Sequence, residues 1–146
     1  MTALGGHLMS LTVEDKLAIN DLMSRAAYAF DVQDLDMLEA CFTEDAEFIM
    51  QIAGGDPVGP FVGRPAIMKL FADSIEVQTD VRKHVVSNLF FDESGEEPKA
   101  TSNLTLISTE NGETDVLTAG FYRDTLAHND NEWRIAHRFI ELDRAY

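Results

Sequence analysis

Asp31 and His84 are the two side chains whose types could do acid–base chemistry together. A carboxylate that accepts a hydrogen bond from one imidazole nitrogen fixes the tautomer of the ring and raises the basicity of the other nitrogen. Such a pair is a general base that works near neutral pH. The two residues are far apart in the chain, so the pair forms only if the fold brings them together.

Each of the two residues also has a purely structural explanation. Asp31 follows a predicted helix, where the helix dipole disfavours a carboxylate by roughly 0.3–1 kcal/mol, so it could instead cap the next helix. His84 opens a strand with apolar residues on both faces, where a buried histidine can be satisfied by an ordinary neighbour. The residues alone leave a base and two structural side chains as alternatives.

Few other groups in the sequence could hold a metal or a phosphate. Cys41 is the single cysteine, which excludes an internal disulfide and fits a reducing cytoplasm. There is no HExxH sequence and no pair of histidines at ligand spacing, so we expect no metal site. Gly54 and Gly55 are followed by Asp56 and Pro57 rather than by a helix start with a lysine, so they do not form a phosphate loop.

The composition indicates an acidic globular domain. The 146 residues include 26 acidic and 11 basic side chains, which gives a formal charge of −15. This charge repels phosphates, so neither nucleic acid nor an anionic membrane surface is an expected partner. An apolar content of 45% can build one core at this length, and no run of 18 apolar residues occurs. We expect a flexible leader over 1–11, a single domain over 12–146 and a cytoplasmic protein.

Helical signals are gathered in the first half of the chain. Thr12 is a typical helix cap, and the apolar residues that follow recur at helical spacing, which predicts a helix over about 12–30. Asp34 predicts the cap of a second, shorter helix that carries Leu35, Leu38, Cys41 and Phe42. Pro65 predicts the start of a third helix.

The second half reads as strands separated by turns. A short strand is predicted over 46–52, and four longer ones over 82–92, 99–109, 114–127 and 132–142. Ser94-Gly95, Asn111-Gly112 and Asn129-Asp130-Asn131 are hairpin signals between them. This order predicts an α+β domain with a meander curled over the helices. Strict alternation places the following residues on one face of their strands: His84, Val86, Asn88 and Phe90, and likewise Trp133, Ile135, His137 and Phe139.

Six short motifs occur in an order that resembles the SnoaL-like branch of the nuclear transport factor 2-like superfamily, over about residues 11 to 143. They are Tyr28-Ala29-Phe30-Asp31, Cys41-Phe42-Thr43-Glu44-Asp45-Ala46, Gly63-Arg64-Pro65-Ala66-Ile67, His84-Val85-Val86-Ser87-Asn88, Ala119-Gly120-Phe121-Tyr122-Arg123-Asp124 and Trp133-Arg134-Ile135-Ala136-His137-Arg138. The resemblance implies a cone-shaped α+β barrel, in which a strongly curved sheet wraps three helices around one apolar pocket.

The patterns look most like those of scytalone dehydratase, bile acid 7α-dehydratase and hexachlorocyclohexane dehydrochlorinase. These enzymes use an Asp–His dyad for an elimination without a cofactor, which implies the same roles for Asp31 and His84. The resemblance also matches Tyr28 to a dehydratase tyrosine and Arg138 to an arginine of the dehydrochlorinase. Those enzymes carry tails that close the pocket, whereas this sequence ends at Tyr146, so we expect a more open pocket or one covered by a neighbouring subunit.

The leading hypothesis is a cofactor-free lyase or isomerase for a small hydrophobic, cyclic substrate. His84 would take a proton, Asp31 would orient it, and Tyr28, Asn88 or Arg138 would bind a developing oxyanion or the leaving group. The expected pocket lining is Met23, Phe30, Phe48, Met50, Phe90 and Phe139. The alternative is a non-catalytic ligand-binding or assembly module, as in the β subunits of ring-hydroxylating dioxygenases. Apolar residues on the late strands, Val116, Tyr122, Leu126 and Ile135, predict a homodimer or homotrimer.

Overall fold

The described part of the chain is folded from its first residues. The computed structural model describes residues 10–146, so residues 1–9 of the predicted leader lie outside the described part of the chain. Leu11 is already buried, and its backbone N–H donates to the Glu93 carboxylate at 2.6 Å. None of the helices in the described range is both long and apolar enough to cross a membrane.

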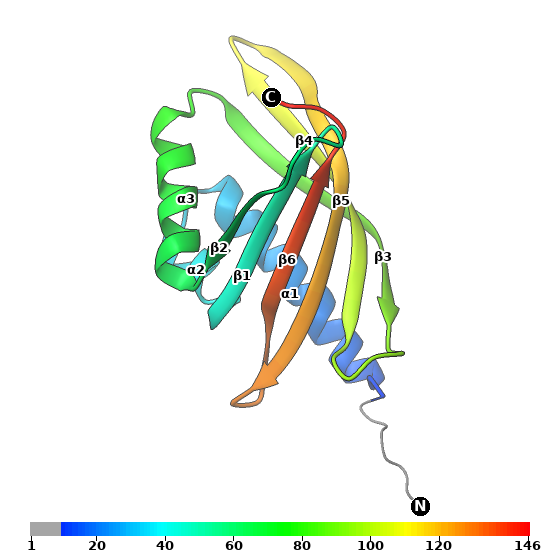
Figure 1. Cartoon of the computed structure of the whole chain (residues 1–146). Helices are drawn as coiled ribbons and strands as arrows, with labels where there is room; N and C mark the ends of the chain where they lie inside the picture. The colour runs from blue at the N-terminus through cyan, green and yellow to red at the C-terminus, as the bar shows by residue number, and fades with distance from the viewer. Residues whose placement is uncertain (1–9) are drawn as a thin grey trace, which may run out of the picture.

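Three helices form in the first half of the chain (Figure 1): α1 (Val13–Asp31), α2 (Leu35–Glu39) and α3 (Arg64–Val77). Thr12 caps α1, because its hydroxyl accepts from the Asp15 N–H at 3.0 Å while the Asp15 carboxylate accepts from the Thr12 N–H at 2.9 Å. Asp34 caps α2 by accepting from the Met37 N–H at 3.1 Å. The helix positions follow the sequence signals closely.

Six strands form one curved sheet in the order β2-β1-β6-β5-β4-β3. Their bounds are β1 (Phe42–Ile52), β2 (Val58–Val62), β3 (Val81–Asp92), β4 (Lys99–Glu110), β5 (Glu113–Asn129) and β6 (Glu132–Leu142). β1 runs parallel to β6 and every other pair is antiparallel, so the sheet is mixed. Figure 1 shows the sheet bending around α1, which crosses one face, while α3 packs against β1 and β2. This is the predicted α+β architecture.

Two parts of the sheet differ from the sequence expectation. β1 begins at Phe42, which pairs with Ile135 of β6, although the apolar spacing had placed Phe42 with the second helix. β2 is absent from the expectation because its five residues are mostly exposed and include Pro60, so they lack a buried-face pattern. Proline is tolerated there because β2 is an edge strand.

A bulge in β3 overturns the predicted faces of its second half. The register with β4 shifts between Ser87 and Phe90, and Asn88 has a φ of 54°. An extra residue in one strand moves every later side chain to the opposite face. Leu89 and Phe91 therefore pack against the core, while Asn88 is exposed and Phe90 is 60% exposed. The expectation that Asn88 and Phe90 face the pocket is wrong.

A second bulge does the same in β6. Thr125 of β5 pairs with His137 and Leu126 pairs with Ile135, so Ala136 has no partner in that ladder. Ile135 and Arg138 consequently both face inward, although strict alternation would separate them. Phe139 faces outward beside His137, so its expected place in the pocket lining is wrong.

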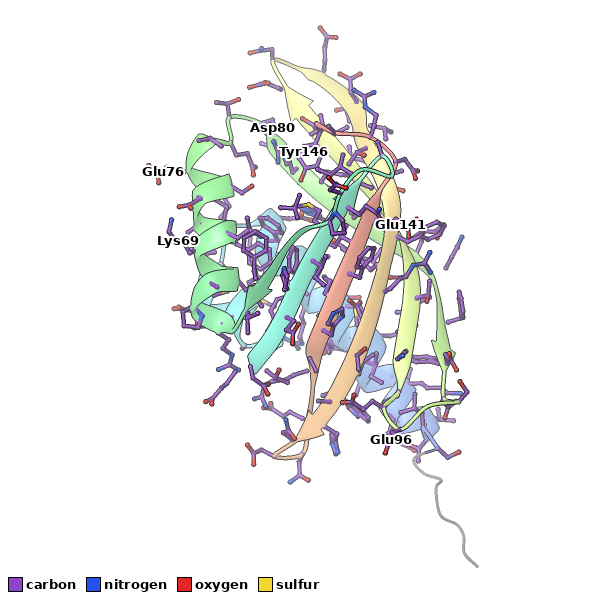
Figure 2. The ribbon with its side chains drawn as sticks, viewed as in Figure 1. Lys69, Glu76, Asp80, Glu96, Glu141 and Tyr146 are labelled. Carbon is purple, nitrogen blue, oxygen red and sulfur yellow. The ribbon has the colours of Figure 1, made fainter. Side chains whose placement is uncertain are left out.

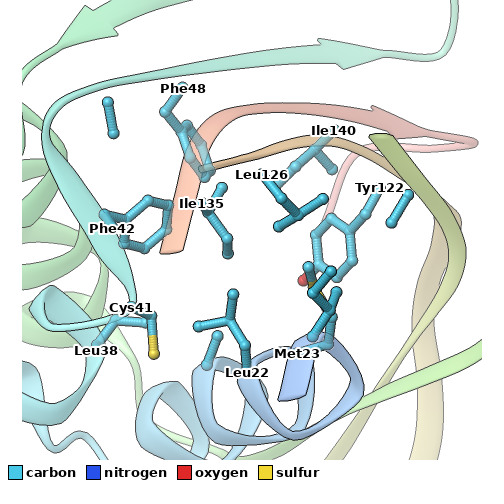
Figure 3. Close-up of a cluster of buried hydrophobic side chains, with 14 of the residues drawn as sticks. Leu22, Met23, Leu38, Cys41, Phe42, Phe48, Tyr122, Leu126, Ile135 and Ile140 are labelled. Atoms are coloured by element: carbon cyan, nitrogen blue, oxygen red, sulfur yellow. The ribbon is translucent and has the colours of Figure 1, made fainter. Parts of the chain in front are cut away.

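The core lies between α1 and the concave side of the sheet. In Figure 3, Leu22 and Met23 of α1 face side chains from three strands, among them Phe48, Tyr122, Leu126, Ile135 and Ile140. A Cβ at Gly120 would lie 1.9 Å from the Glu141 carbonyl oxygen, so only glycine permits this approach of β5 to β6.

Most of the residues on which the prediction of self-association rests are buried in the core of the domain. Tyr122, Leu126 and Ile135 are buried inside the domain, and only Val116 is exposed, at 62%. A homodimer or homotrimer stays a prediction, and its apolar surface has to come from other residues.

Candidate functional site

A cavity of about 100 Å³ lies between α1, α3 and the concave side of the sheet. Its lining is mainly apolar and includes four residues of the expected set, Met23, Phe30, Phe48 and Met50. Polar or charged groups reach it from five other lining residues, Ser74, His84, Tyr122, Arg138 and Tyr146. The cavity therefore combines an apolar enclosure with a few polar groups, as small-molecule sites do.

Asp31 and His84 meet at the edge of this cavity. Asp31 is the last residue of α1, and His84 lies near the start of β3. The His84 Nδ1 atom is 2.6 Å from the Asp31 Oδ1 atom, and the side chains are 9% and 10% exposed. Helix end and strand start are thus joined by a short, buried hydrogen bond.

Two further interactions hold the pair in place. The backbone N–H of His84 donates to both carboxylate oxygens of Asp31, at 2.9 and 3.1 Å. The ring of Phe30 stacks on the imidazole, with centroids 4.8 Å apart and an interplanar angle of 18°. The N–H donors of His84 offset the unfavourable interaction of the Asp31 carboxylate with the helix dipole at the end of α1. The cap of α2 is Asp34, so Asp31 is not needed for that structural role.

The hydrogen bonding assigns a tautomer to His84. An ionised carboxylate only accepts, so the proton between the two groups belongs to Nδ1. In the neutral ring Nε2 then carries a lone pair, and among residues 10–146 no group forms a hydrogen bond with it. Because His84 lines the cavity, this lone pair is available to a bound molecule. The arrangement is that of a general base oriented by a carboxylate.

Arg138 forms an ion pair with Asp124 at the cavity. Its Nε and Nη2 atoms donate to the two Asp124 oxygens at 2.7 and 2.9 Å, and the side chains are 8% and 1% exposed. Burial alone would lower the pKa of Arg138, but the charge and hydrogen bonds of Asp124 raise it above its ordinary value. Nη2 also lies 3.2 Å from the Met23 sulfur. Arg138 therefore supplies a fixed, largely neutralised positive charge.

Tyr28 does not belong to the cavity, whereas three polar residues that the sequence did not suggest do, namely Ser74, Tyr122 and Tyr146. Tyr28 lies on the solvent side of α1 and is 59% exposed, so its expected catalytic role is wrong. Tyr122 enters the cavity because β5 presents it on the same face as Asp124. Alternation along residues 120–124 predicts that Tyr122 and Asp124 share a face. Both faces of the segment contain apolar residues, however, so the sequence does not indicate which face is buried. Ser74 reaches the cavity from α3, although it does not belong to the apolar stripe that predicts the buried face of this helix.

Tyr146 lines the same cavity from the segment after β6. Figure 2 shows it beside Asp80, and the Arg82 guanidinium lies 5.2 Å from the centre of its ring. Arg82 is held by Asp80 at 3.0 Å, and Thr118 donates to the carbonyl of Arg144 at 2.8 Å. The segment is thus tied back onto the domain beside the cavity.

The described residues offer no obvious metal centre. Among residues 10–146, no three or more His, Cys, Asp or Glu side chains cluster in a way that could hold an ion. Cys41 is buried, and its Sγ donates to the Met37 carbonyl at 3.4 Å. Burial raises the pKa of the Cys41 thiol, which makes it a weak nucleophile.

Comparisons with known proteins agree with the fold. The model of a family described as the SnoaL-like domain matches residues 11–139. No curated protein matches the chain. Among solved structures, a Mycobacterium tuberculosis protein of unknown function is 26% identical, with a TM-score of 0.76 over 92% of this chain and 79% of that one.

Two proteins of Novosphingobium aromaticivorans share the fold at lower identity. One is described as NTF2-like with a cystatin-like fold, and it is 21% identical with a TM-score of 0.75 over 89% of this chain and 82% of that one. The other is assigned as the β subunit of an aromatic-ring-hydroxylating dioxygenase, and it is 19% identical with a TM-score of 0.75 over 89% and 90%. The match to the SnoaL-like family and to NTF2-like structures confirms the predicted superfamily and fold.

Proposed function

The chain belongs to the SnoaL-like domain family, and from this premise we propose that it is a cofactor-independent lyase or isomerase acting on a small, apolar, cyclic substrate. The observation that carries the proposal is the buried hydrogen bond between Asp31 and His84, which leaves Nε2 of His84 open to the cavity. Asp31 also accepts the main-chain N–H of His84, but that contact does not require the imidazole, so the side-chain pair itself favours proton transfer.

The proposed reaction begins with removal of a proton from carbon by Nε2 of His84. The electron pair of the broken C–H bond forms a double bond and either expels a leaving group or passes to a conjugated oxygen. Asp31 stabilises the imidazolium that results, as an oriented carboxylate does. Arg138 contributes a positive charge at the same cavity, where negative charge develops on the substrate.

The charges around the cavity favour an uncharged substrate. Asp31 and Asp124 are each paired, and Arg138 is the cation that Asp124 neutralises. A substrate carboxylate would find no unpaired cation among the cavity-lining residues 10–146. The volume of about 100 Å³ suits a compact ring, since drug-sized ligands need about 300 Å³ or more.

The base is testable with 5-nitrobenzisoxazole, a neutral bicyclic compound. Loss of its C–H proton breaks the N–O bond and yields a coloured nitrile phenolate, so elimination is read by absorbance. We expect saturable catalysis by the wild type and a loss of about 10²–10⁴-fold in His84→Gln, which retains an N–H for Asp31 but has no basic nitrogen. His137→Gln, on the outer face of β6, is the matched control and should retain the rate.

A rate no higher than that of buffer, or equal rates for wild type and His84→Gln, would contradict the proposed base. The second candidate is then a non-catalytic binding or assembly module. Its support is the shared fold with the assigned dioxygenase β subunit, together with the small size of the cavity. In that case Asp31→Asn would leave ligand binding unchanged.

We also propose that the chain self-associates through the outer face of the sheet. Several apolar side chains are exposed on β3 and β5, namely Val85, Phe90, Val116 and Phe121. Exposed apolar residues gathered on one sheet favour burial against a partner. Light scattering should give the mass of a homodimer or homotrimer at micromolar concentration, and a monomer would refute this proposal.

A further inference from the structure

The Tyr122 hydroxyl is a buried polar group without a protein partner. Tyr122 is 5% exposed, and no group of residues 10–146 forms a hydrogen bond with its phenol oxygen. Buried hydroxyls are almost always hydrogen-bonded, because an unpaired one loses its hydration without compensation. An exception inside a cavity lining indicates that the missing partner is a molecule bound there.

The surroundings of Tyr122 aim this group into the site. On β5 it lies between Ser102 of β4 and Ile140 of β6, with its ring on the concave side of the sheet. Figure 3 shows the phenol end extending from the sheet towards Met23 of α1. Tyr122, Met23 and His84 all line the same cavity, so a ligand there can meet both the base and the phenol.

Building on the proposed function, we infer that Tyr122 binds the oxygen of the substrate, donating a hydrogen bond to the carbonyl or leaving-group oxygen on which negative charge develops. His84 takes the proton, and Tyr122 holds the atom that receives the electron pair. The substrate class is thereby narrowed to neutral ring compounds that carry such an oxygen. A purely hydrocarbon or halogenated ring would leave the phenol unpaired.

The electrostatics of the site support a donor at this position. Burial raises the pKa of Tyr122 to about 12, so the hydroxyl remains protonated at physiological pH. The Arg138 guanidinium lies 3.9 Å from the centre of the Tyr122 ring. This positive charge stabilises negative charge that the phenol comes to share with a bound oxygen. Arg138 itself has two of its donor nitrogens committed to Asp124.

The test compares two ligands of similar size, cyclohexanone and toluene, in wild type and Tyr122→Phe. Binding is measured by NMR titration, with the carbonyl ¹³C shift of labelled cyclohexanone as a reporter of hydrogen bonding. We expect Tyr122→Phe to weaken the binding of cyclohexanone about three- to tenfold. The change in carbonyl ¹³C shift that hydrogen bonding causes in the bound ligand should be lost. Toluene should bind equally well or better. Tyr28→Phe removes the same atom from an exposed tyrosine and is the matched control.

A structural role makes a different prediction for the same variant. If the hydroxyl only supported the fold, Tyr122→Phe would lower the melting temperature and affect both ligands alike. An unchanged cyclohexanone affinity, or no binding of either ligand to wild type up to about 10 mM, would overturn the inference. Asp31→Asn separates it from the proposed base, because that variant disables the base and should leave the preference for cyclohexanone intact.

Discussion

Asp31–His84 and Asp124–Arg138, both beside the cavity, place a carboxylate against a nitrogen base in different ways. Asp31 meets one nitrogen of His84 and leaves the other free, whereas Asp124 takes up two donor nitrogens of Arg138. Both pairs are about nine-tenths buried or more. Histidine can exchange a proton near neutral pH and arginine cannot. The first pair is therefore suited to proton transfer, and the second to a constant field.

The difference also appears in how each pair is supported. Asp31 accepts from the main chain of His84, so its position does not depend on the charge of the imidazole. Asp124 lies on β5 facing Arg138 on the neighbouring strand, and its partner is permanently charged. Removing a charge should consequently alter chemistry at the first pair and folding at the second.

The largest expected effect is the loss of elimination activity in Asp31→Asn. Asparagine retains the shape of the side chain but lacks the negative charge that stabilises the imidazolium, so the rate should fall by about 10²–10⁴-fold. The rate is measured by the absorbance of the phenolate product, with circular dichroism to check that the variant is folded. Asp34→Asn, a change at the exposed cap of α2, is the control.

An unchanged elimination rate in Asp31→Asn, with the fold intact, would contradict this assignment. Asp31 would then be a structural residue like Asp124, and the two pairs would not differ in function.

The next effect concerns stability at the second pair. Asp124→Asn leaves the buried Arg138 guanidinium without its counter-charge, which should cost about 3–5 kcal/mol of unfolding free energy in urea. The double variant Asp124→Leu with Arg138→Met removes both charges and should recover much of that loss. If Asp124→Asn were as stable as wild type, the ion pair of Asp124 with Arg138 would not be needed to keep the buried guanidinium in place.

A smaller effect is expected at alkaline pH, because burial raises the pKa of the Tyr122 hydroxyl. Its pKa of about 12 lies above the ordinary value of 10, so the folded state favours the protonated phenol. That contribution is complete below pH 10 and declines as the pH rises through 12, by up to roughly 3 kcal/mol. Tyr122→Phe should flatten the stability profile over this interval, and Tyr28→Phe should not.

The sequence predicted the elements better than the faces they present. Helix caps and turn residues act locally, so Thr12, Asp34 and Asn111-Gly112 mark their boundaries within a residue or two. The meeting of Asp31 with His84 was accessible only through the resemblance, because nothing in their spacing encodes the contact.

The bulges explain most of the misplaced site residues. Asn88 tolerates a positive φ, so it offered a weak local signal, but Ala136 offered none. Each bulge depends on how a strand pairs with its neighbour, which lies far away in the sequence. The phase of alternation is therefore reliable up to the bulge, at His84 and Val86, and inverted beyond it.

The smallest expected effect tests this inversion at Phe90 and Leu89. If β3 alternated strictly, Phe90 would fill the cavity, and Phe90→Ala would cost about 3–5 kcal/mol. With the bulge, Phe90 is 60% exposed in the single chain, so the substitution should change the unfolding free energy of the monomer by less than about 0.5 kcal/mol. Leu89→Ala, one residue earlier and packed against the core, should cost clearly more. Urea unfolding of the two variants measures both losses of unfolding free energy. A larger loss for Phe90→Ala than for Leu89→Ala would contradict the bulge and would place the Phe90 ring in the pocket, as strict alternation predicts.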